Sequence, residues 1–382
     1  MFQRLIKNDL KENKVSMLVI GLFLLLTLTL SFAATRLTVS LTSSIERFVE
    51  TAKSPHLLQM HSGSVDRERL QNFVQQYPEI ASWQLTDFVN VEGSAIRING
   101  QDSLQDSSQD NGFSSQNQNF DFLLDQDNQP AQPRPGQVYI PLYYYNSGKI
   151  KIGDQIRVGK LQLTVQGFIR DAQMNASLVS SKRFLISQTD LQILKTEAFA
   201  SNENLIAFRV HKLSQISTIE QAYKNAELES NGPPMITYPT IKMINGFNDA
   251  LVILVMGLLV MAIIGMTFLC MRFALLTKIQ EDLQQIAVMK VMGLPQSFIS
   301  RVYLTKYYFC LALATIAGWG LSFLLSSPFK KQMALSMGQS PTPFYSYLLE
   351  MLVALLLCLL VFWLTARPLS SFKKMTPGQA LR

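Results

Sequence analysis

The sequence predicts an α-helical membrane protein with four transmembrane helices and a mixed α/β extracytoplasmic domain inserted between helices 1 and 2. Three observations lead to this fold class. Hydrophobic residues make up 48% of the 382 residues, and charged residues make up only 16%. The apolar residues gather in four blocks, each about the 20 residues that a helix needs to cross a bilayer. Basic residues flank these blocks, while the long segment between the first two has the composition of a soluble domain.

The four apolar blocks give the boundaries of the membrane helices. We expect these helices at 15–37, 248–272, 307–326 and 347–366. The first block also has small residues, Ser31 and Ala33, where a signal peptide would be cleaved. Its apolar stretch is longer than the roughly 7–15 residues of a signal core, and apolar residues keep one helical face beyond it. We therefore interpret it as an uncleaved anchor that continues as a stalk helix.

The distribution of charge predicts how the helices are oriented. Thirteen basic and four acidic side chains lie in the segments 1–14, 272–306 and 367–382, a net charge of +9. The segment 38–246 has 18 basic and 21 acidic residues. Cytoplasmic loops of membrane proteins carry an excess of Lys and Arg. We therefore interpret the basic excess as a topology signal with both termini in the cytoplasm, and not as a nucleic-acid-binding surface.

The segment 38–246 is predicted to be an extracytoplasmic α/β domain carried on stalks. Apolar and β-branched residues alternate at Gln137–Leu142, Leu161–Ile169 and Asn204–Val210, which predicts strands. The stretch 99–135 is dominated by Gln, Asn, Asp and Ser. Such a composition buries too little apolar surface to offset the entropy of ordering the chain. We therefore expect a disordered loop there.

The remaining segments are short. We expect an amphipathic cytoplasmic helix at 1–14, an extracytoplasmic loop at 327–346 and a cytoplasmic tail at 367–382. Glu350 lies near the outer end of the fourth helix, where we expect its carboxylate to reach the membrane interface; a buried functional carboxylate is the alternative.

Motifs for catalysis, metal binding and nucleotide binding are weak. A Walker A loop needs Gly, four residues, then Gly-Lys followed by Ser or Thr. The nearest stretch, Gly153 to Gly159-Lys160, is one residue too long and is followed by Leu161. The histidines and cysteines show no metal-ligand spacing. We therefore predict no catalytic, cofactor-binding or metal-binding residue in the chain and no enzymatic activity, with any driving ATP bound by a partner subunit.

The cytoplasmic segment 273–306 is too short for a domain and too regular for a loop. Its apolar spacing continues the second helix as far as residue 290. Gly293 and Pro295 then interrupt the helix, because glycine readily ends a helix and proline cannot continue one. Helical spacing resumes at Gln296. A helix–turn–helix of this kind at the cytoplasmic face has the shape needed to fit a groove in a partner protein.

At this segment the sequence resembles the FtsX/MacB-like family of ABC transporter permeases. The likeness rests on Gln285–Gly293, Lys151–Ile156, Leu163–Ile169 and Thr376–Arg382. Together with the helix order and loop sizes, it spans nearly the whole chain. The chain departs from the family in having Gln285 where Glu is common, and Lys306 where an acidic residue often begins the third helix.

The resemblance implies a dimer of permease chains, identical or different, bound to two ATPase subunits in a bacterial cytoplasmic membrane. It implies mechanotransmission, in which ATP hydrolysis moves the external domain to export or extract peptides, antibiotics or lipids. The alternative is a membrane regulator that activates a cell-wall hydrolase or a sensor kinase; an extracytoplasmic protein partner fits either role. The residues assigned to ATPase coupling are Gln285, Ile286, Val288, Met289, Lys290, Gly293, Leu294, Pro295 and Arg301.

Overall fold

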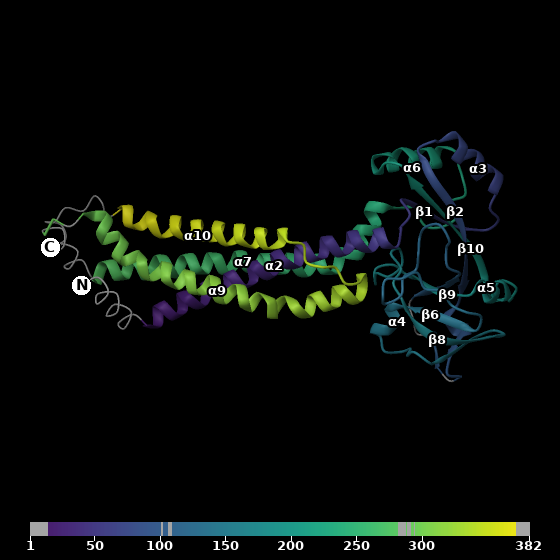
Figure 1. The fold of residues 1–382 in the computed structure, drawn as a ribbon, viewed down its shortest axis with the longest axis horizontal. Helices are drawn as coiled ribbons and strands as arrows, with labels where there is room; N and C mark the ends of the chain where they lie inside the picture. The colour runs from purple at the N-terminus through teal and green to yellow at the C-terminus, as the bar shows by residue number, and fades with distance from the viewer. Residues whose placement is uncertain are drawn as a thin grey trace. The chain divides into compact units, whose positions relative to one another are not determined.

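The computed structural model describes residues 14–100, 102–105, 109–281, 288, 292–293 and 295–371. The chain divides into two compact units. The helical unit comprises residues 1–41, 249–331 and 341–382, and the sheet domain comprises residues 42–248 and 332–340. Figure 1 shows the elements of both units. The amphipathic helix expected at 1–14 lies almost entirely outside the described residues.

Long helices supply the membrane-spanning part of the chain (Figure 1). They are α2 at Lys14–Thr51, α7 at Tyr238–Glu281, α9 at Gln296–Met337 and α10 at Tyr345–Ser371. Stretches long and apolar enough to cross a membrane run over Met17–Thr51, Tyr238–Ala274, Tyr307–Met337 and Tyr345–Trp363. The predicted fold class is therefore confirmed: four apolar helices, with a mixed sheet domain between the first and the second.

The first helix, α2, forms the core of the helical unit. Half of its most apolar stretch is buried, compared with 11% for α7 and 17% for α10. Ile20, Leu24, Leu28 and Phe32 follow one another at intervals of four residues and are almost fully buried. This spacing places them on one face of the helix. They pack in one cluster with residues of the other three helices, including Met271.

The described residues of the sheet domain form one mixed sheet. Its strands are β1 (Leu57–Ser62), β2 (Ile80–Val91), β3 (Ile96–Ile98), β4 (Asp102–Ser103), β5 (Asp110–Ser114), β6 (Gln137–Pro141), β7 (Gln155–Val158), β8 (Leu161–Ile169), β9 (Ser181–Ile186), β10 (Ser201–Val210) and β11 (Ile236–Thr237). They are ordered β11-β1-β10-β2-β5-β9-β6-β8-β7-β3-β4. The pairs β5–β9 and β6–β8 are parallel, and the other pairs are antiparallel.

Short helices cover parts of this sheet. They are α3 (Arg67–Gln76), α4 (Leu142–Asn146), α5 (Gln188–Leu194) and α6 (Ile216–Asn225). One apolar core joins α3 and α6 to β1 and β10 through Phe73, Tyr223 and Phe208. A second core includes Phe113 of β5 and Phe184 of β9, whose rings stack 4.9 Å apart.

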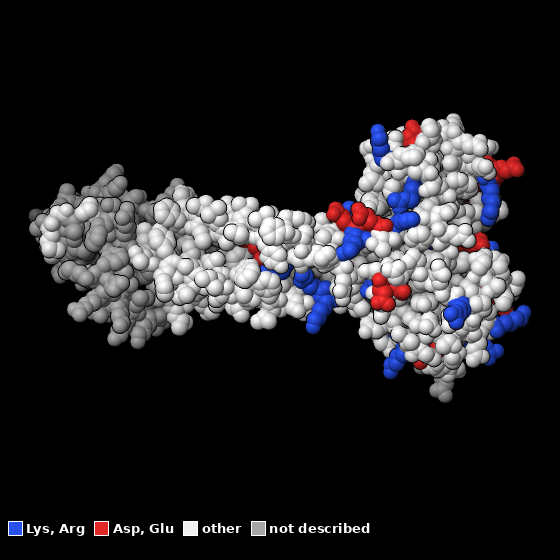
Figure 2. All heavy atoms as spheres, viewed as in Figure 1, with Lys and Arg blue, Asp and Glu red and all other residues white. Residues whose placement is uncertain are grey.

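Figure 2 shows charged side chains of both signs over this domain and few on the described part of the helical unit.

The stretch 99–135 is not the disordered loop that its composition predicts. Its described residues form β4, β5 and a packed segment in which Phe113, Phe120 and Leu124 are buried. The polar side chains there bind the backbone instead of water. Gln116 Nε2, for example, donates to the carbonyl oxygens of residues 123 and 131. Few apolar residues suffice because tertiary hydrogen bonds satisfy the polar groups.

The third membrane helix also differs from expectation. We expected it to end at 326 and a loop to follow at 327–346, but α9 continues to Met337 with Pro328 inside it. Residues 330–335 read Lys-Lys-Gln-Met-Ala-Leu, which are strong helix formers. The helix ends at Gly338, which has φ of +87° and donates its N–H to the Ala334 carbonyl at 2.9 Å.

Candidate functional site: the coupling turn and the helix anchors

The residues predicted to couple to an ATPase surround the connection between α7 and α9. Gln285, Ile286, Met289, Lys290 and Leu294 lie outside the described residues, and Arg301 is described only through its backbone in α9. Within the described part, Met292 N–H donates to the Val288 carbonyl at 3.0 Å, and Gly293 has φ of +79°. The turn that the sequence predicts at Gly293 is therefore present, and α9 begins directly after Pro295.

The turn exposes apolar side chains. Val288 is 54% exposed and Met292 is 66% exposed. Exposed apolar side chains beside a reversal of the chain are suited to insertion into a groove of another protein. The assignment of these residues to ATPase coupling remains a prediction.

A buried network of charges lies in the sheet domain, and sequence reasoning did not find it. Arg183, on β9, donates from Nε and Nη2 to the two carboxylate oxygens of Asp171 at 2.8 and 2.9 Å. Its Nη1 donates to Asp121 at 3.0 Å. All three side chains are at most 3% exposed. Gln173 and Asn117 also donate to the Asp121 carboxylate, so the acid is held from several sides.

Burial and the neighbouring charges act in opposite directions on the pKa values of Asp121 and Arg183. Burial raises the pKa of the Asp121 carboxyl, and the attraction of Arg183 opposes that rise. Burial alone would lower the pKa of Arg183, but the two carboxylates reverse this and raise it. Burial also lowers the pKa of the neighbouring Lys182 to about 8.

The ammonium group of Lys182 binds backbone carbonyls of the loop that follows β8. Its Nζ donates to the backbone carbonyls of Met174, Ala176 and Val179 at 3.1, 2.8 and 2.5 Å. An ammonium group has three donors, and here all three meet carbonyl oxygens of one loop. Together with the Arg183 network, it fixes the segment 170–177, which we call the anchor loop.

The anchor loop and the neighbouring Asp121 hold the ends of two helices that enter the sheet domain. Beyond α2, the carbonyls of Ala52 and Lys53 accept hydrogen bonds from the backbone N–H groups of residues 122 and 121 at 2.7 and 3.0 Å. On α7, Asn245 Nδ2 donates to the Ala172 carbonyl at 2.6 Å, and Asn248 Nδ2 donates to Ser177 Oγ at 3.2 Å. The charge network is therefore bonded, within one or two residues, to both stalk helices.

A second buried ion pair lies inside the helical unit. Arg36 on α2 donates to the two carboxylate oxygens of Glu350 on α10, from Nε at 2.9 Å and from Nη2 at 2.7 Å. Trp319 Nε1 on α9 donates to the same carboxylate at 3.0 Å, and the Arg36 guanidinium stacks 3.5 Å from the centre of the Phe323 ring. Glu350 is 1% exposed, so its carboxylate is paired inside the unit and is not directed outward as expected.

The physical reason for that difference is the position of Arg36. A charged side chain in an apolar environment is stable only if it is paired. Arg36 lies just beyond the first apolar block. Its partner is 314 residues away in the chain, so the sequence around Arg36 does not identify it. The pair and Trp319 join α2, α9 and α10 at one point.

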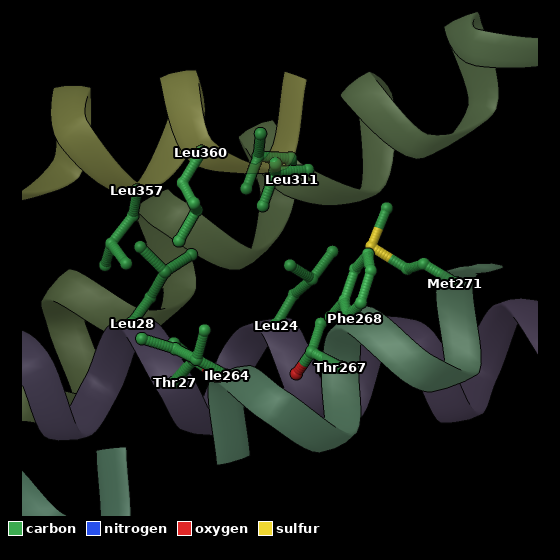
Figure 3. Close-up of a pocket in the computed structure, with 11 residues that line it drawn as sticks. Leu24, Thr27, Leu28, Ile264, Thr267, Phe268, Met271, Leu311, Leu357 and Leu360 are labelled. Carbon is green, nitrogen blue, oxygen red and sulfur yellow. The ribbon is translucent and has the colours of Figure 1, made fainter. Parts of the chain in front are cut away.

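An apolar cavity of about 20 Å³ lies between the four helices of this unit (Figure 3). The close-up shows Leu24 and Leu28 of α2, Phe268 of α7 and Leu357 of α10 among its lining residues. Among the described residues, no group of three or more His, Cys, Asp or Glu side chains could hold a metal ion.

Replacement of Arg183 by Met should destabilise the sheet domain in a pH-dependent way. It leaves Asp121 and Asp171 buried without a counterion, which costs about 3 kcal/mol or more of unfolding free energy at pH 7. A carboxyl group whose pKa is raised in the folded state destabilises the protein as the pH rises through that pKa. The substitution should therefore lower the unfolding free energy less at pH 5 than at pH 7. Thermal unfolding of the purified protein at both pH values measures it. Arg157→Met, on the surface, is the control; equal losses at pH 5 and 7 contradict the prediction.

Breaking the Arg36–Glu350 pair should destabilise the helical unit more than removing it. Arg36→Met or Glu350→Met alone leaves a buried unpaired charge, and each should cost about 3 kcal/mol or more. The double variant should recover most of this loss. Trp319→Phe removes one hydrogen bond to the pair and should cost about 1 kcal/mol. Unfolding in detergent as a double-mutant cycle measures the coupling, and additive losses would show that the pair does not exist.

Comparison with known proteins gives a family for part of the chain. Residues 250–373 match the FtsX-like permease C-terminal domain family. This range begins within α7, includes the Gly293 turn and α9, and extends beyond the last residue of α10. No curated relative matches the chain.

Two solved structures are similar to about half of the chain. The periplasmic region of MacB from Actinobacillus actinomycetemcomitans is 10% identical, with a TM-score of 0.28, over 51% of this chain and 94% of that one. The extracellular domain of the noncanonic ABC-type transporter YknZ from Gram-positive bacteria is 11% identical, with a TM-score of 0.26, over 47% and 98%. The family match begins within α7 and covers the Gly293 turn, α9 and α10, so this part of the chain is similar to the C-terminal domain of FtsX-like permeases.

Proposed function

We propose that this chain is the membrane subunit of an ABC transporter, in which ATP hydrolysis by a separate ATPase subunit moves the sheet domain. The observation that carries the proposal is the FtsX-like permease match over 250–373, because it includes the turn at Gly293. The sequence has no phosphate-binding loop, so the energy comes from the partner and the chain itself catalyses no reaction.

The coupling turn is suited to receive motion from such a partner. Exposed Val288 and Met292 supply apolar contact area beside Gly293, where the chain reverses. Both helices that leave the turn are long, with 44 residues in α7 and 42 in α9. A hydrogen-bonded helix is stiff along its axis, so displacement of the turn displaces the far ends of α7 and α9. A second permease chain, identical or different, completes the proposed assembly.

Movement of the sheet domain could serve two functions. Export or extraction of peptides, antibiotics or lipids is the first, and activation of a cell-wall hydrolase or a sensor kinase through an extracytoplasmic protein partner is the second. The same moving part serves both, because neither needs a substrate channel between the helices. ATP-dependent resistance of cells to a peptide antibiotic supports export, whereas altered wall hydrolysis or kinase signalling with unchanged resistance supports regulation.

The proposed orientation has both termini and the Gly293 turn in the cytoplasm of a bacterium and the sheet domain outside. Its support is the basic excess beside the helices, +9 over three segments, against a slightly acidic sheet domain. With this assignment, successive helices cross the membrane in alternating directions.

Cysteine labelling in intact cells should confirm that orientation. In a chain whose Cys270, Cys310 and Cys358 are replaced by Ser, single cysteines are placed at Leu213 in the sheet domain and at Met292 in the turn. Leu213 is 52% exposed and Met292 is 66% exposed, so both sites are accessible. A membrane-impermeant maleimide should label the Leu213→Cys variant at once and the Met292→Cys variant only after permeabilisation. The reverse pattern would refute the proposed topology and function together.

Disruption of the coupling turn should release the ATPase. Simultaneous replacement of Ile286 and Met289 by Ser and of Gly293 by Val removes apolar contacts and forces a branched side chain into a φ of +79°. We expect at least about a tenfold drop in the ABC ATPase that co-purifies with the tagged chain from native membranes, identified by mass spectrometry. The matched control replaces exposed Ile193 and Leu213 of the sheet domain by Ser. Undiminished co-purification would refute the coupling assignment.

A further inference from the structure

The end of α9 is bonded to the sheet domain although the chain does not continue from it into the sheet. Helix α2 leads into β1, and β11 leads into α7, so both have covalent connections to the domain. Beyond Met337, by contrast, the chain leads to α10. Yet Gln332–Ser340 belongs to the same compact unit as the sheet. Met333 and Met337 are 3% and 4% exposed, so this last part of α9 is buried on the domain.

Arg170 makes most of this attachment. The residue is 4% exposed and is the first residue of the anchor loop. Its Nε donates to the Leu335 carbonyl at 2.8 Å, and its Nη2 donates to the Ala334 carbonyl at 3.3 Å. The last carbonyls of a helix carry partial negative charge, so a guanidinium is well suited to them. The Ala334 carbonyl also accepts the Gly338 N–H. The planar fork of Arg also donates from separate nitrogens in a fixed geometry, whereas Lys donates from a single nitrogen.

The same side chain binds the domain with its third nitrogen. Nη1 of Arg170 donates to the carbonyls of Asp125 and Gln126 at 3.0 and 3.1 Å, and to Asn128 Oδ1 at 2.7 Å. Arg170 therefore lies between the end of α9 and the 125–128 turn and bonds to both. Asn175, also in the anchor loop, adds a bond from Nδ2 to the Ser336 carbonyl at 2.9 Å.

Two further features are consistent with an attachment that moves as one piece with the domain. A Cβ built on Gly338 would lie 2.3 Å from Asn128 Oδ1, so the backbone at the end of α9 is in close contact with the turn that Arg170 binds. Pro328 lies inside α9, three residues before the helical unit ends at Lys331. Proline removes one backbone hydrogen bond from the helix, which makes bending there easier than elsewhere in α9.

We propose that Arg170 is a positioning residue that locks the end of α9 onto the sheet domain, which gives the domain a third connection to the permease helices beyond α2 and α7. The inference rests on the proposed function, because the connection transmits motion that the ATPase supplies. The new connection is noncovalent, so its hydrogen bonds can be removed by substitution while the two covalent stalks stay intact. Its loss should uncouple the domain without preventing ATP hydrolysis.

The test uses the full chain with its co-purified ATPase in lipid nanodiscs and pulsed EPR between paired spin labels. Labels at Gln332 and Ile193 report whether the end of α9 is held on the domain, and labels at Ile316 and Ile193 report movement of the domain relative to the membrane helix. In the unsubstituted chain we expect a narrow Gln332–Ile193 distance distribution and an Ile316–Ile193 distance that shifts when ATP is bound and hydrolysis is blocked with vanadate.

Arg170→Gln should broaden the first distribution and reduce the ATP-dependent shift by at least half, while ATP hydrolysis continues. Arg170→Lys should retain more of the ATP-dependent shift than Arg170→Gln does. Asn175→Ala should reduce that shift less than Arg170→Gln does. Arg157→Gln, a surface Arg of the same domain, is the matched control. If Arg170→Gln fails to fold, Gly338→Ala tests the same contact from the helix side, because its Cβ meets Asn128 and its φ is +87°.

The outcomes separate this inference from the proposed function. A full ATP-dependent shift in Arg170→Gln despite a broadened Gln332–Ile193 distribution would overturn the third connection and leave the proposed function intact. An unchanged Gln332–Ile193 distribution in both Arg170→Gln and Gly338→Ala would overturn the locking role. Absence of any ATP-dependent shift in the unsubstituted chain would overturn the proposed function and, with it, the inference.

Discussion

The guanidinium of Arg183 holds together the region where the stalk helices meet the sheet. It forms ion pairs with Asp171 in the anchor loop and with Asp121 in the segment beside α2, and all three groups are buried. Without it, two carboxylates would face each other away from water, and the loops that carry them would separate. Those loops supply the groups that bind the ends of α2 and α7. One side chain therefore maintains the geometry of both stalks.

The helical unit uses the same chemistry at another point. Arg36 and Glu350 are paired and bonded to Trp319, which links three of its four helices where apolar packing alone would allow them to slide. Apolar side chains pack in many registers with similar energy, whereas a bidentate ion pair has one geometry. Buried polar contacts thus specify positions in both units, and apolar packing supplies most of the stabilisation. A protein that transmits motion through helices needs such fixed points.

Prediction from the sequence succeeded where one local property decides the structure. Strand β8 occupies Leu161–Ile169 as its alternation predicted, and the turn at Gly293 follows from glycine before proline. It failed over 99–135, because composition counts polar side chains as solvated, whereas Gln116 and its neighbours are satisfied by backbone groups within the fold. It also failed for Glu350, because the expected exposure ignored a partner far away in the sequence.

From the sequence alone, four apolar helices, a mixed sheet domain between the first and second of them, and a resemblance to a permease family could be predicted. The length of an apolar stretch, the position of charged residues and a short motif are local properties of the sequence. Each can be recognised without knowledge of any tertiary contact. That Arg183, Arg36 and Arg170 join separate segments becomes visible only in the folded chain. Each pairs with groups that are adjacent only after folding, and a charged residue in a sequence carries no information about which buried partner will compensate it.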